Sequence, residues 1–194
     1  MNTHNYAIST LTDYSRLDEV YRLTHDTLVE VKHLVPRADG EIISFHHLDI
    51  SEQTTILVAQ HTGRVVGTIS VSDDGPDGLM SDKIFEAETE RIRRQTPHGL
   101  GSTWRMATSD EYRSERSLVI NLIKSAFFVC FEHHIDTCLI LNVERHTPIY
   151  KRMLGAEIVA KGSTSLDGMV QINVALMKLN VLQAWKRFMK VAKV

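Results

Sequence analysis

The chain has 194 residues, of which 43% are hydrophobic and 24% are charged, and its formal net charge is -2 at pH 7. This composition excludes a disordered or fibrous chain and predicts one globular domain over residues 1–194 with a sizeable core. No apolar run approaches the roughly 18 to 20 residues of a membrane span, and residues 1–5 lack the regions of a signal peptide, so we expect a cytoplasmic protein.

The first sixty residues or so predict a strand, helical structure and the start of a hairpin. Residues 6–10 alternate weakly, as an edge strand does. Asp13 or Ser15 can cap a helix whose apolar residues continue, with breaks, towards Pro36. The pattern fits one long helix or two short helices equally well. Residues 37–49 have no clear period and predict a loop or a poorly formed helix.

A β-hairpin is the clearest local prediction. Residues 55–59 and 65–71 are rich in strand-forming side chains, and Gly63 between them supplies the positive φ that a short hairpin loop requires. A turn-rich loop follows at 73–78, and Ser81 or Asp82 then opens a charged helix to Gln95. The apolar residues that this helix can bury are Ile84, Phe85, Ala87 and Ile92. Because hairpin loops usually take about two to five residues, the loop and helix at about 73–100 are predicted to be an insertion with a functional or partner-binding role.

The centre of the chain predicts two parallel strands joined by a long helix. Residues 102–107 form the first strand, and residues 113–134 form a half-buried helix with apolar side chains at helical spacing: Val119, Leu122, Ile123, Ala126, Phe127 and Cys130. The nearly unbroken apolar run at 137–143 is typical of a strand covered on both faces, and a right-handed crossover makes it parallel to the first. Cys130 and Cys138 lie in apolar stretches and are predicted to be buried free thiols.

The C-terminal part predicts a short helix, two strands and a basic helix. Pro148 starts the short helix and Gly155 ends it, and residues 157–160 and 169–177 alternate as strands. The terminal helix at about 180–194 has apolar residues on one face, namely Val181, Leu182, Trp185, Phe188, Met189 and Ala192. Its basic residues, with no acid among them, can meet an acidic carrier protein, lie on a membrane surface or simply face water. Nucleic-acid binding is not expected, because no basic patch interleaves with aromatic residues.

This order of elements resembles the GNAT-type N-acyltransferases. Residues 142–156, with Asn142, Tyr150 and Gly155, are similar to that superfamily's asparagine, tyrosine and glycine segment. More narrowly, Arg145 with His146, Tyr150 and the insertion at 73–101 resemble the long-chain N-acyl amino acid synthases, which are relatives of the acyl-homoserine lactone synthases. The resemblance implies a mixed α/β (α+β) fold with a mostly antiparallel central sheet of about six or seven strands, a splayed parallel pair and flanking helices.

The activity that the resemblance implies is transfer of an acyl group, long rather than acetyl, to the amine of a small molecule such as an amino acid. The donor would be a thioester of an acyl carrier protein or of coenzyme A, and no bound cofactor or metal is expected. Arg116 and Leu118 stand where acetyl-CoA-using relatives have glycines, so their side chains would crowd a pyrophosphate and favour the single phosphate of a carrier protein. Two alternatives remain open, an ordinary acetyl-CoA-dependent N-acetyltransferase and a non-catalytic binding protein that keeps the fold.

The resemblance also implies roles for particular residues. Tyr150 would protonate the leaving thiolate, and a backbone N–H near Met106 or Ala107 would hold the oxyanion. Asn142 would hold the pantetheine arm, and the phosphate would lie near Arg113, Arg116 and Ser117. The acceptor would lie near Ser102, Trp104, Arg105 and Asp49, with Arg105 binding its carboxylate. Glu144 and Asp49 are weak candidates for the base. Ser102 and Ser70 replace a glutamate and an arginine that the acyl amino acid and homoserine lactone synthases usually carry, which bears on acceptor binding.

Several of these residues also have plain structural interpretations. Tyr150 can fill a short helix, and Arg105 can belong to a structural ion pair. His133 and His134 lie near acids, as metal ligands do, yet they end a helix, where the dipole favours histidine. His46 and His47 have no partner cluster for a metal, and His146 is either a capping or packing residue or a general base.

Overall fold

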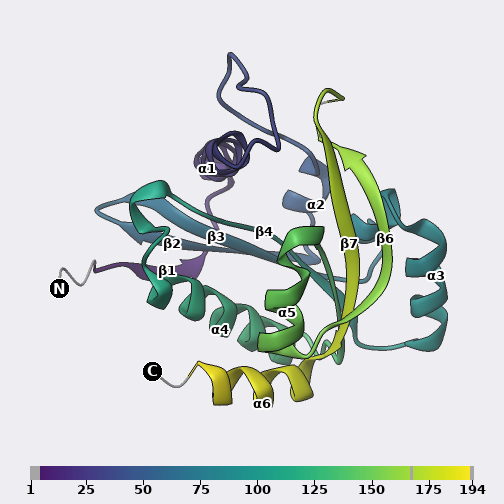
Figure 1. Cartoon of the computed structure of the whole chain (residues 1–194). Coiled ribbons are helices and arrows are strands. Elements are labelled where there is room, and N and C mark those ends of the chain that lie inside the picture. The colour runs from purple at the N-terminus through teal and green to yellow at the C-terminus, as the bar shows by residue number, and fades with distance from the viewer. Residues whose placement is uncertain (1–4, 167, 193–194) are drawn as a thin grey trace.

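The computed structural model describes residues 5–166 and 168–192, and its centre is a seven-stranded sheet in the order β1-β2-β3-β4-β5-β7-β6 (Figure 1). The β4–β5 pair is parallel and the other pairs are antiparallel. This arrangement confirms the mixed, mostly antiparallel fold with one parallel pair. The strands are β1 (Ala7–Thr10), β2 (Thr54–His61), β3 (Arg64–Asp73), β4 (Leu100–Thr108), β5 (Thr137–Val143), β6 (Glu157–Ser165) and β7 (Gln171–Asn180).

Helices flank the sheet on both faces. Figure 1 shows α1 on one face and α4 with α6 on the other, while α3 lies outside the β6–β7 hairpin. Aromatic rings tie α4 to α6, with Phe127 5.5 Å from Trp185 and 5.7 Å from Phe188 between ring centroids. The helices are α1 (Leu17–Glu30), α2 (His46–Asp49), α3 (Glu86–Gln95), α4 (Arg116–Glu132), α5 (Thr147–Leu154) and α6 (Val181–Val191), with short 3₁₀ turns at η1 (Tyr14–Arg16), η2 (Met80–Lys83), η3 (Asp110–Tyr112) and η4 (Glu144–His146).

The local predictions with a backbone reason are confirmed. The β2–β3 turn places Thr62 and Gly63 at φ 48° and 82°, the pair of positive angles that a two-residue turn matched to strand twist requires. Helix α5 carries a proline in its first turn and ends at Gly155, whose φ of 71° is left-handed. Cys130 and Cys138 are buried free thiols.

Three helix boundaries differ from prediction. Helix α1 is a single helix that ends at Glu30, because Lys32 turns to a φ of 60°. The helix of the insertion begins at Glu86 rather than at Ser81 or Asp82, since those residues form the separate turn η2. Helix α4 begins at Arg116 rather than at residue 113, because residues 110–112 form η3. The stretch 37–49 is mostly loop and ends in the four-residue helix α2.

Burial corrects the predicted helix faces. Helix α3 buries Thr89 and Ile92, whose spacing leaves Ala87 on the exposed side. Helix α4 is about half buried, as predicted: its buried residues are Leu118, Ile120, Leu122, Ala126, Phe127, Val129 and Cys130. In α6, Phe188 is fully buried but Leu182 is 52% exposed, so the predicted apolar face is narrower than expected. With Phe188 buried, and with Lys186, Arg187 and Lys190 facing solvent, contact of α6 with a carrier protein or a membrane stays a prediction.

Candidate active site

The parallel strands β4 and β5 separate halfway along their length. Residues 100–103 pair with residues 137–140, and beyond Thr103 and Ile140 the ladder stops. Strand β4 also slips in register against β3, where Ser70 faces Trp104 but Thr68 faces Ala107. Arg105, within this bulge, has a φ of 52°, which is uncommon for a bulky residue. Because a bulge leaves residues out of the ladder, the register of β4 with β3 skips Arg105 and Met106 and resumes at Ala107.

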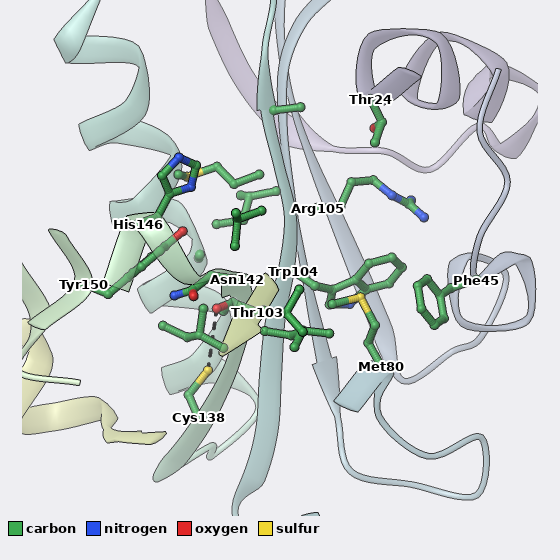
Figure 2. Close-up of a pocket in the computed structure, with 18 of the residues that line it drawn as sticks. Thr24, Phe45, Met80, Thr103, Trp104, Arg105, Cys138, Asn142, His146 and Tyr150 are labelled. Carbon is green, nitrogen blue, oxygen red and sulfur yellow. Dashed lines mark hydrogen bonds between the residues drawn. The ribbon is translucent and has the colours of Figure 1, made fainter. Parts of the chain in front are cut away.

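A cavity of ≈ 310 Å³ occupies the gap between the two strands. Its wall is largely apolar and is built from both faces of the sheet (Figure 2). Strands β4 and β5, helices α1, α4 and α5, and the insertion all contribute; representative side chains are Phe45, Met80, Ile84, Ile123, Ile140 and Leu166. A volume at the lower end of the roughly 300–1,000 Å³ of small-molecule pockets, lined by hydrocarbon, suits an apolar chain.

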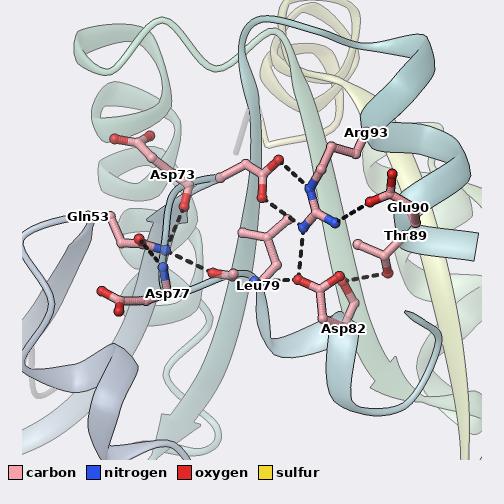
Figure 3. Close-up of polar contacts among 11 residues, drawn as sticks. Gln53, Asp73, Asp77, Leu79, Asp82, Thr89, Glu90 and Arg93 are labelled. Carbon is pink, nitrogen blue, oxygen red and sulfur yellow. Dashed lines mark hydrogen bonds and ion pairs between the residues drawn. The ribbon is translucent and has the colours of Figure 1, made fainter. Parts of the chain in front are cut away.

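The insertion forms one rigid wall of this cavity. Arg93 holds it together by binding three acids, Asp74 at 2.7 Å, Asp82 at 2.8 Å and Glu90 at 2.9 Å (Figure 3). The side chain of Gln53 donates to the backbone oxygens of residues 73 and 78, at 3.0 and 2.8 Å, which joins the loop to the strand beside it. These bonds hold the segment that carries Met80 and Ile84 in place against the cavity.

A few polar groups converge on the cavity from β5 and the turn after it. Asn142 is 8% exposed and its Nδ2 donates to Met177 Sδ at 3.2 Å. Its buried Oδ1 has no hydrogen-bond partner within the described parts of the chain, so it can accept a bond from a ligand. Figure 2 shows His146 and Tyr150 on the same side of β4 as Asn142.

The environments of Tyr150 and His146 push their pKa values in opposite directions. Burial raises the pKa of the Tyr150 phenol, which keeps it protonated at neutral pH. Burial, the Arg145 charge and nearby His33 lower the pKa of the His146 imidazole, which keeps it neutral. A protonated acid and a neutral base beside one cavity are the two groups that acyl transfer to an amine requires. His146 stands at the N-cap position of α5 but makes no side-chain capping bond, which argues against the capping interpretation.

Two residues predicted to bind the acceptor are bound to each other. Arg105, with a side chain 5% exposed, donates from both terminal nitrogens to the fully buried carboxylate of Asp49, with 2.8 Å between Nη2 and Oδ2. The Tyr21 hydroxyl donates to the same carboxylate at 3.1 Å, and the Arg105 guanidinium lies 4.3 Å from the Trp104 ring centroid. Figure 2 shows Arg105 pointing from β4 to the side opposite Tyr150. This geometry favours the structural ion pair over a carboxylate clamp.

Trp104 and Ser102 lie on the same strand as Arg105 but have different surroundings. Trp104 packs against Phe45 at 5.8 Å between centroids, and its Nε1 donates to Ser72 Oγ at 2.9 Å. Ser102 and Ser70 are buried, and their hydroxyls have no hydrogen-bond partner among the residues that the structure describes. Trp104 therefore contributes to the cavity wall, whereas the two serines belong to the sheet interior.

The predicted phosphate-binding residues at the start of α4 face acids. Arg113 pairs with Glu30 and lies 3.6 Å from Asp110. Ser117 Oγ donates to Glu115 at 2.6 Å, and Glu115 is itself the N-cap residue of α4. Arg116 is the first residue of the helix and is exposed. A carboxylate at the helix N-terminus repels a pyrophosphate, so this turn differs from a phosphate cradle.

The remaining candidates take part in contacts of their own. Glu144 pairs with Lys161 at 2.6 Å, and His133 pairs with Asp73 at 2.7 Å. In residues 5–166 and 168–192, no group of three or more His, Cys, Asp and Glu is placed to hold a metal. Over the same residues, no helix has the length and apolarity to cross a membrane.

Most of the residues that line the cavity were not predicted from the sequence as site residues, and His33, Phe45 and Met80 are examples. Phe45 and Met80 lie in segments without helical or strand periodicity, and His33 lies in the broken end of the predicted helix before Pro36, so no local pattern marks these residues. They meet only because the loop after α1, the segment before α2 and the insertion converge on the β4–β5 gap. Their type gave one usable signal, since an aromatic or methionine side chain in a polar loop often packs against something.

Comparison with known proteins identifies the family of the chain. A sequence profile described as N-acyl amino acid synthase FeeM matches residues 19–180. The structure is similar to that of FeeM, an N-acyl amino acid synthase from uncultured soil microbes, with a TM-score of 0.77, 18% sequence identity and 98% of each chain covered. No curated protein sequence matches the chain.

More distant structures share the fold. BjaI, a CoA-dependent acyl-homoserine lactone synthase determined with SAM and isopentyl-CoA, has a TM-score of 0.65 and 18% identity, with 96% of this chain and 90% of BjaI covered. The ribosomal-protein-S18-alanine N-acetyltransferase from Escherichia coli has a TM-score of 0.61 and 10% identity, with 91% and 94% covered. At these identities the structural likeness establishes the fold alone.

Proposed function

Because the chain belongs to the FeeM family of N-acyl amino acid synthases and is therefore an acyltransferase, we propose that it transfers a long acyl group from a thioester to the α-amine of an amino acid. The observation that carries this proposal is the apolar cavity of ≈ 310 Å³ in the β4–β5 gap. An acetyl group does not need a hydrocarbon-lined cavity of this size, whereas a fatty acyl chain is stabilised by burial in it.

In the proposed reaction the amine nitrogen attacks the thioester carbonyl. His146 accepts the proton that the nitrogen loses as the C–N bond forms. The carbonyl oxygen becomes an oxyanion that accepts hydrogen bonds from the backbone N–H groups at the bulge near Met106 and Ala107. The C–S bond then breaks, and Tyr150 donates its proton to the departing thiolate. The lowered pKa of His146 and the raised pKa of Tyr150 support this division of roles.

His146 takes the place of the two carboxylates that the sequence suggested as bases. Asp49 is fully buried against Arg105, and Glu144 is paired with Lys161. A carboxylate held by a cation is a weaker base, because the cation stabilises its ionised form. The neutral imidazole of His146, which lines the cavity, meets the requirement better.

Asn142 is proposed to bind the pantetheine arm of the donor. Pantetheine carries amide N–H groups, and the buried Oδ1 of Asn142 is an acceptor with no partner in the described part of the chain. The position of Asn142 on β5, opposite the bulge of β4, suits an arm that lies between the separated strands. The bond would satisfy an acceptor whose burial otherwise costs about 1–3 kcal/mol.

An acyl carrier protein is the proposed donor, with acyl-CoA as the alternative. Glu115 at the N-terminus of α4, and the pairing of Arg113 and Ser117 with acids, disfavour a bound pyrophosphate. A carrier protein delivers the same pantetheine arm with one phosphate. Because BjaI is CoA-dependent, acyl-CoA is the alternative donor.

The proposal is tested by offering acetyl-CoA, palmitoyl-CoA and palmitoyl acyl carrier protein with a pool of amino acids, followed by thiol detection and mass spectrometry. An N-palmitoyl amino acid formed from the carrier-protein donor is the expected product. Release from acetyl-CoA alone would replace the proposal with an acetyltransferase. Thiol release without N-acylated product would replace it with a thioesterase, and the Tyr150→Phe variant serves as the control for background hydrolysis.

A further inference from the structure

A second cavity opens beside the acyl cavity. Its volume is ≈ 520 Å³, and the two cavities share His33, Val143 and Ile172 as a common wall. The rest of its lining is Pro148 of α5 and the polar residues Glu144 and Arg145 of η4 and Gln171 and Asn173 of β7. An open cavity with polar side chains along part of its wall, joined to an apolar cavity, suits a molecule or pair of molecules with one polar and one hydrocarbon part.

The positively charged side chain of Arg145 lines this second cavity. The carboxylate of the neighbouring residue Glu144 forms an ion pair with Lys161 at 2.6 Å. Across the described ranges 5–166 and 168–192, Arg145 enters no ion pair; its hydrogen bond runs from Nε to His146 Nε2 at 3.3 Å. The arginine predicted from sequence to bind the acceptor, Arg105, has both terminal nitrogens on Asp49. A planar guanidinium with free donors binds a carboxylate through two parallel hydrogen bonds.

Arg145 and His146 are also placed as an α-amino acid requires. The carboxylate and the amine of such an acceptor are attached to the same carbon atom, so the groups that bind them must be neighbours. Arg145 and His146 are in contact, and His146 lines the acyl cavity while Arg145 lines the second cavity. A carboxylate on Arg145 would therefore leave the amine at His146, where the thioester carbon is proposed to lie.

The contact between the two side chains adds a second consequence. In the structure, Arg145 donates to Nε2 of His146, and the lone pair that accepts this bond is the one a base needs. A carboxylate that attracts the Arg145 donors releases that lone pair. An acceptor that has an amine but no carboxylate does not attract the Arg145 donors, so the lone pair of His146 stays bound to Arg145.

Resting on the proposed function, we propose that Arg145 binds the α-carboxylate of the acceptor in the second cavity and thereby restricts acceptors to free α-amino acids. The class of ligand follows from the chemistry of the site: one anionic group for the guanidinium and one amine beside the imidazole. Arg145 is then a specificity-determining residue of the acceptor site, and Arg105 is not.

The experiment is a competition between acids and amides. A mixture of the protein amino acids and a mixture of their amides compete for palmitoyl acyl carrier protein, and mass spectrometry of N-acyl products gives the ratio of kcat/KM values. The native chain should prefer acids by at least tenfold. Arg145→Gln should reduce that preference to less than threefold, through a loss of kcat/KM with acids that is larger than any loss with amides. Arg152→Gln, which removes a similar exposed charge from α5, should keep the preference.

The outcomes separate this proposal from the proposed function. Equal use of acids and amides by the native chain, or a preference that survives in Arg145→Gln, overturns the acceptor site and leaves acyl transfer standing. An equal loss with acids and amides in Arg145→Gln indicates a structural role and also overturns it. If the native chain acylates neither mixture from any of the three donors, both proposals fall.

Discussion

Asp49→Ala should destabilise the protein strongly, because it removes the partner of a buried arginine. The Arg105 and Asp49 side chains are 5% and 0% exposed, so water cannot replace the lost carboxylate. Breaking one side of a buried ion pair costs about 3–5 kcal/mol. In a chain of this size each kcal/mol lowers Tm by about 2–4 °C, so we expect a fall of roughly 6–20 °C.

The assay is thermal and urea unfolding followed by circular dichroism, with two comparison variants. Arg113→Ala breaks the exposed pair with Glu30, whose side chains are 37% and 42% exposed, and should cost less than about 1 kcal/mol because water screens the pair. The double variant Asp49→Leu/Arg105→Met replaces both charges by apolar groups and should recover most of the loss, because it leaves no unpaired charge buried.

Two results would refute this reasoning. A Tm for Asp49→Ala within about 2 °C of native would mean that the pair does not stabilise the fold. A fully stable Arg105→Ala variant with a raised acceptor Michaelis constant would restore the carboxylate-clamp interpretation of Arg105. An Asp49→Ala variant that does not fold agrees with the prediction. In that case the stability of the double variant shows whether the loss came from the unpaired charge of Arg105.

Three further predictions concern catalysis and chain length. Tyr150→Phe should lower turnover at least tenfold with little change in stability, since it removes only the proton donor; full activity would exclude Tyr150 from the mechanism. Because the pKa of His146 is lowered, kcat/KM of the native chain should fall in acid only below the pH of about 6.5 at which a free histidine gains a proton, and His146→Gln should be slower and lack this acidic limb. A retained limb would assign the base elsewhere. Met80→Trp should fill the acyl cavity and reduce kcat/KM for a palmitoyl donor at least tenfold relative to a butyryl donor; equal losses with both donors would contradict the placement of the chain.

The fold was largely predictable from the chain because its elements follow from local rules. The positive φ values of Thr62 and Gly63 together specify the hairpin turn, and Gly155 ends α5 because it takes a positive φ as well. The apolar run at 137–143 indicates a strand covered on both faces whichever helices cover it. The predictions that failed, such as the start of α4 at residue 113 and the burial of Ala87, concern helix ends and faces, which depend on neighbouring elements.

The candidate site was predictable only in part. Tyr150 and Asn142 follow from their place in a recognisable segment, and the structure places both at the cavity. The ion pair between Arg105 and Asp49 could not be predicted from the sequence, because Asp49 lies 56 positions away and no pattern links the two residues.

The sequence by itself determined the order of the elements, the hairpin, the parallel pair and the residues that can carry acid–base chemistry, because each depends on periodicity or on backbone angles within a few residues. The tertiary structure decided which charges are available. It buries Arg105 against Asp49, leaves Arg145 without an ion pair among the described residues and in contact with His146, and brings His33, Phe45 and Met80 to one gap in the sheet. The physical reason is that burial, electrostatic pairing and cavities depend on segments distant in the chain, whose meeting is set by packing of the whole core.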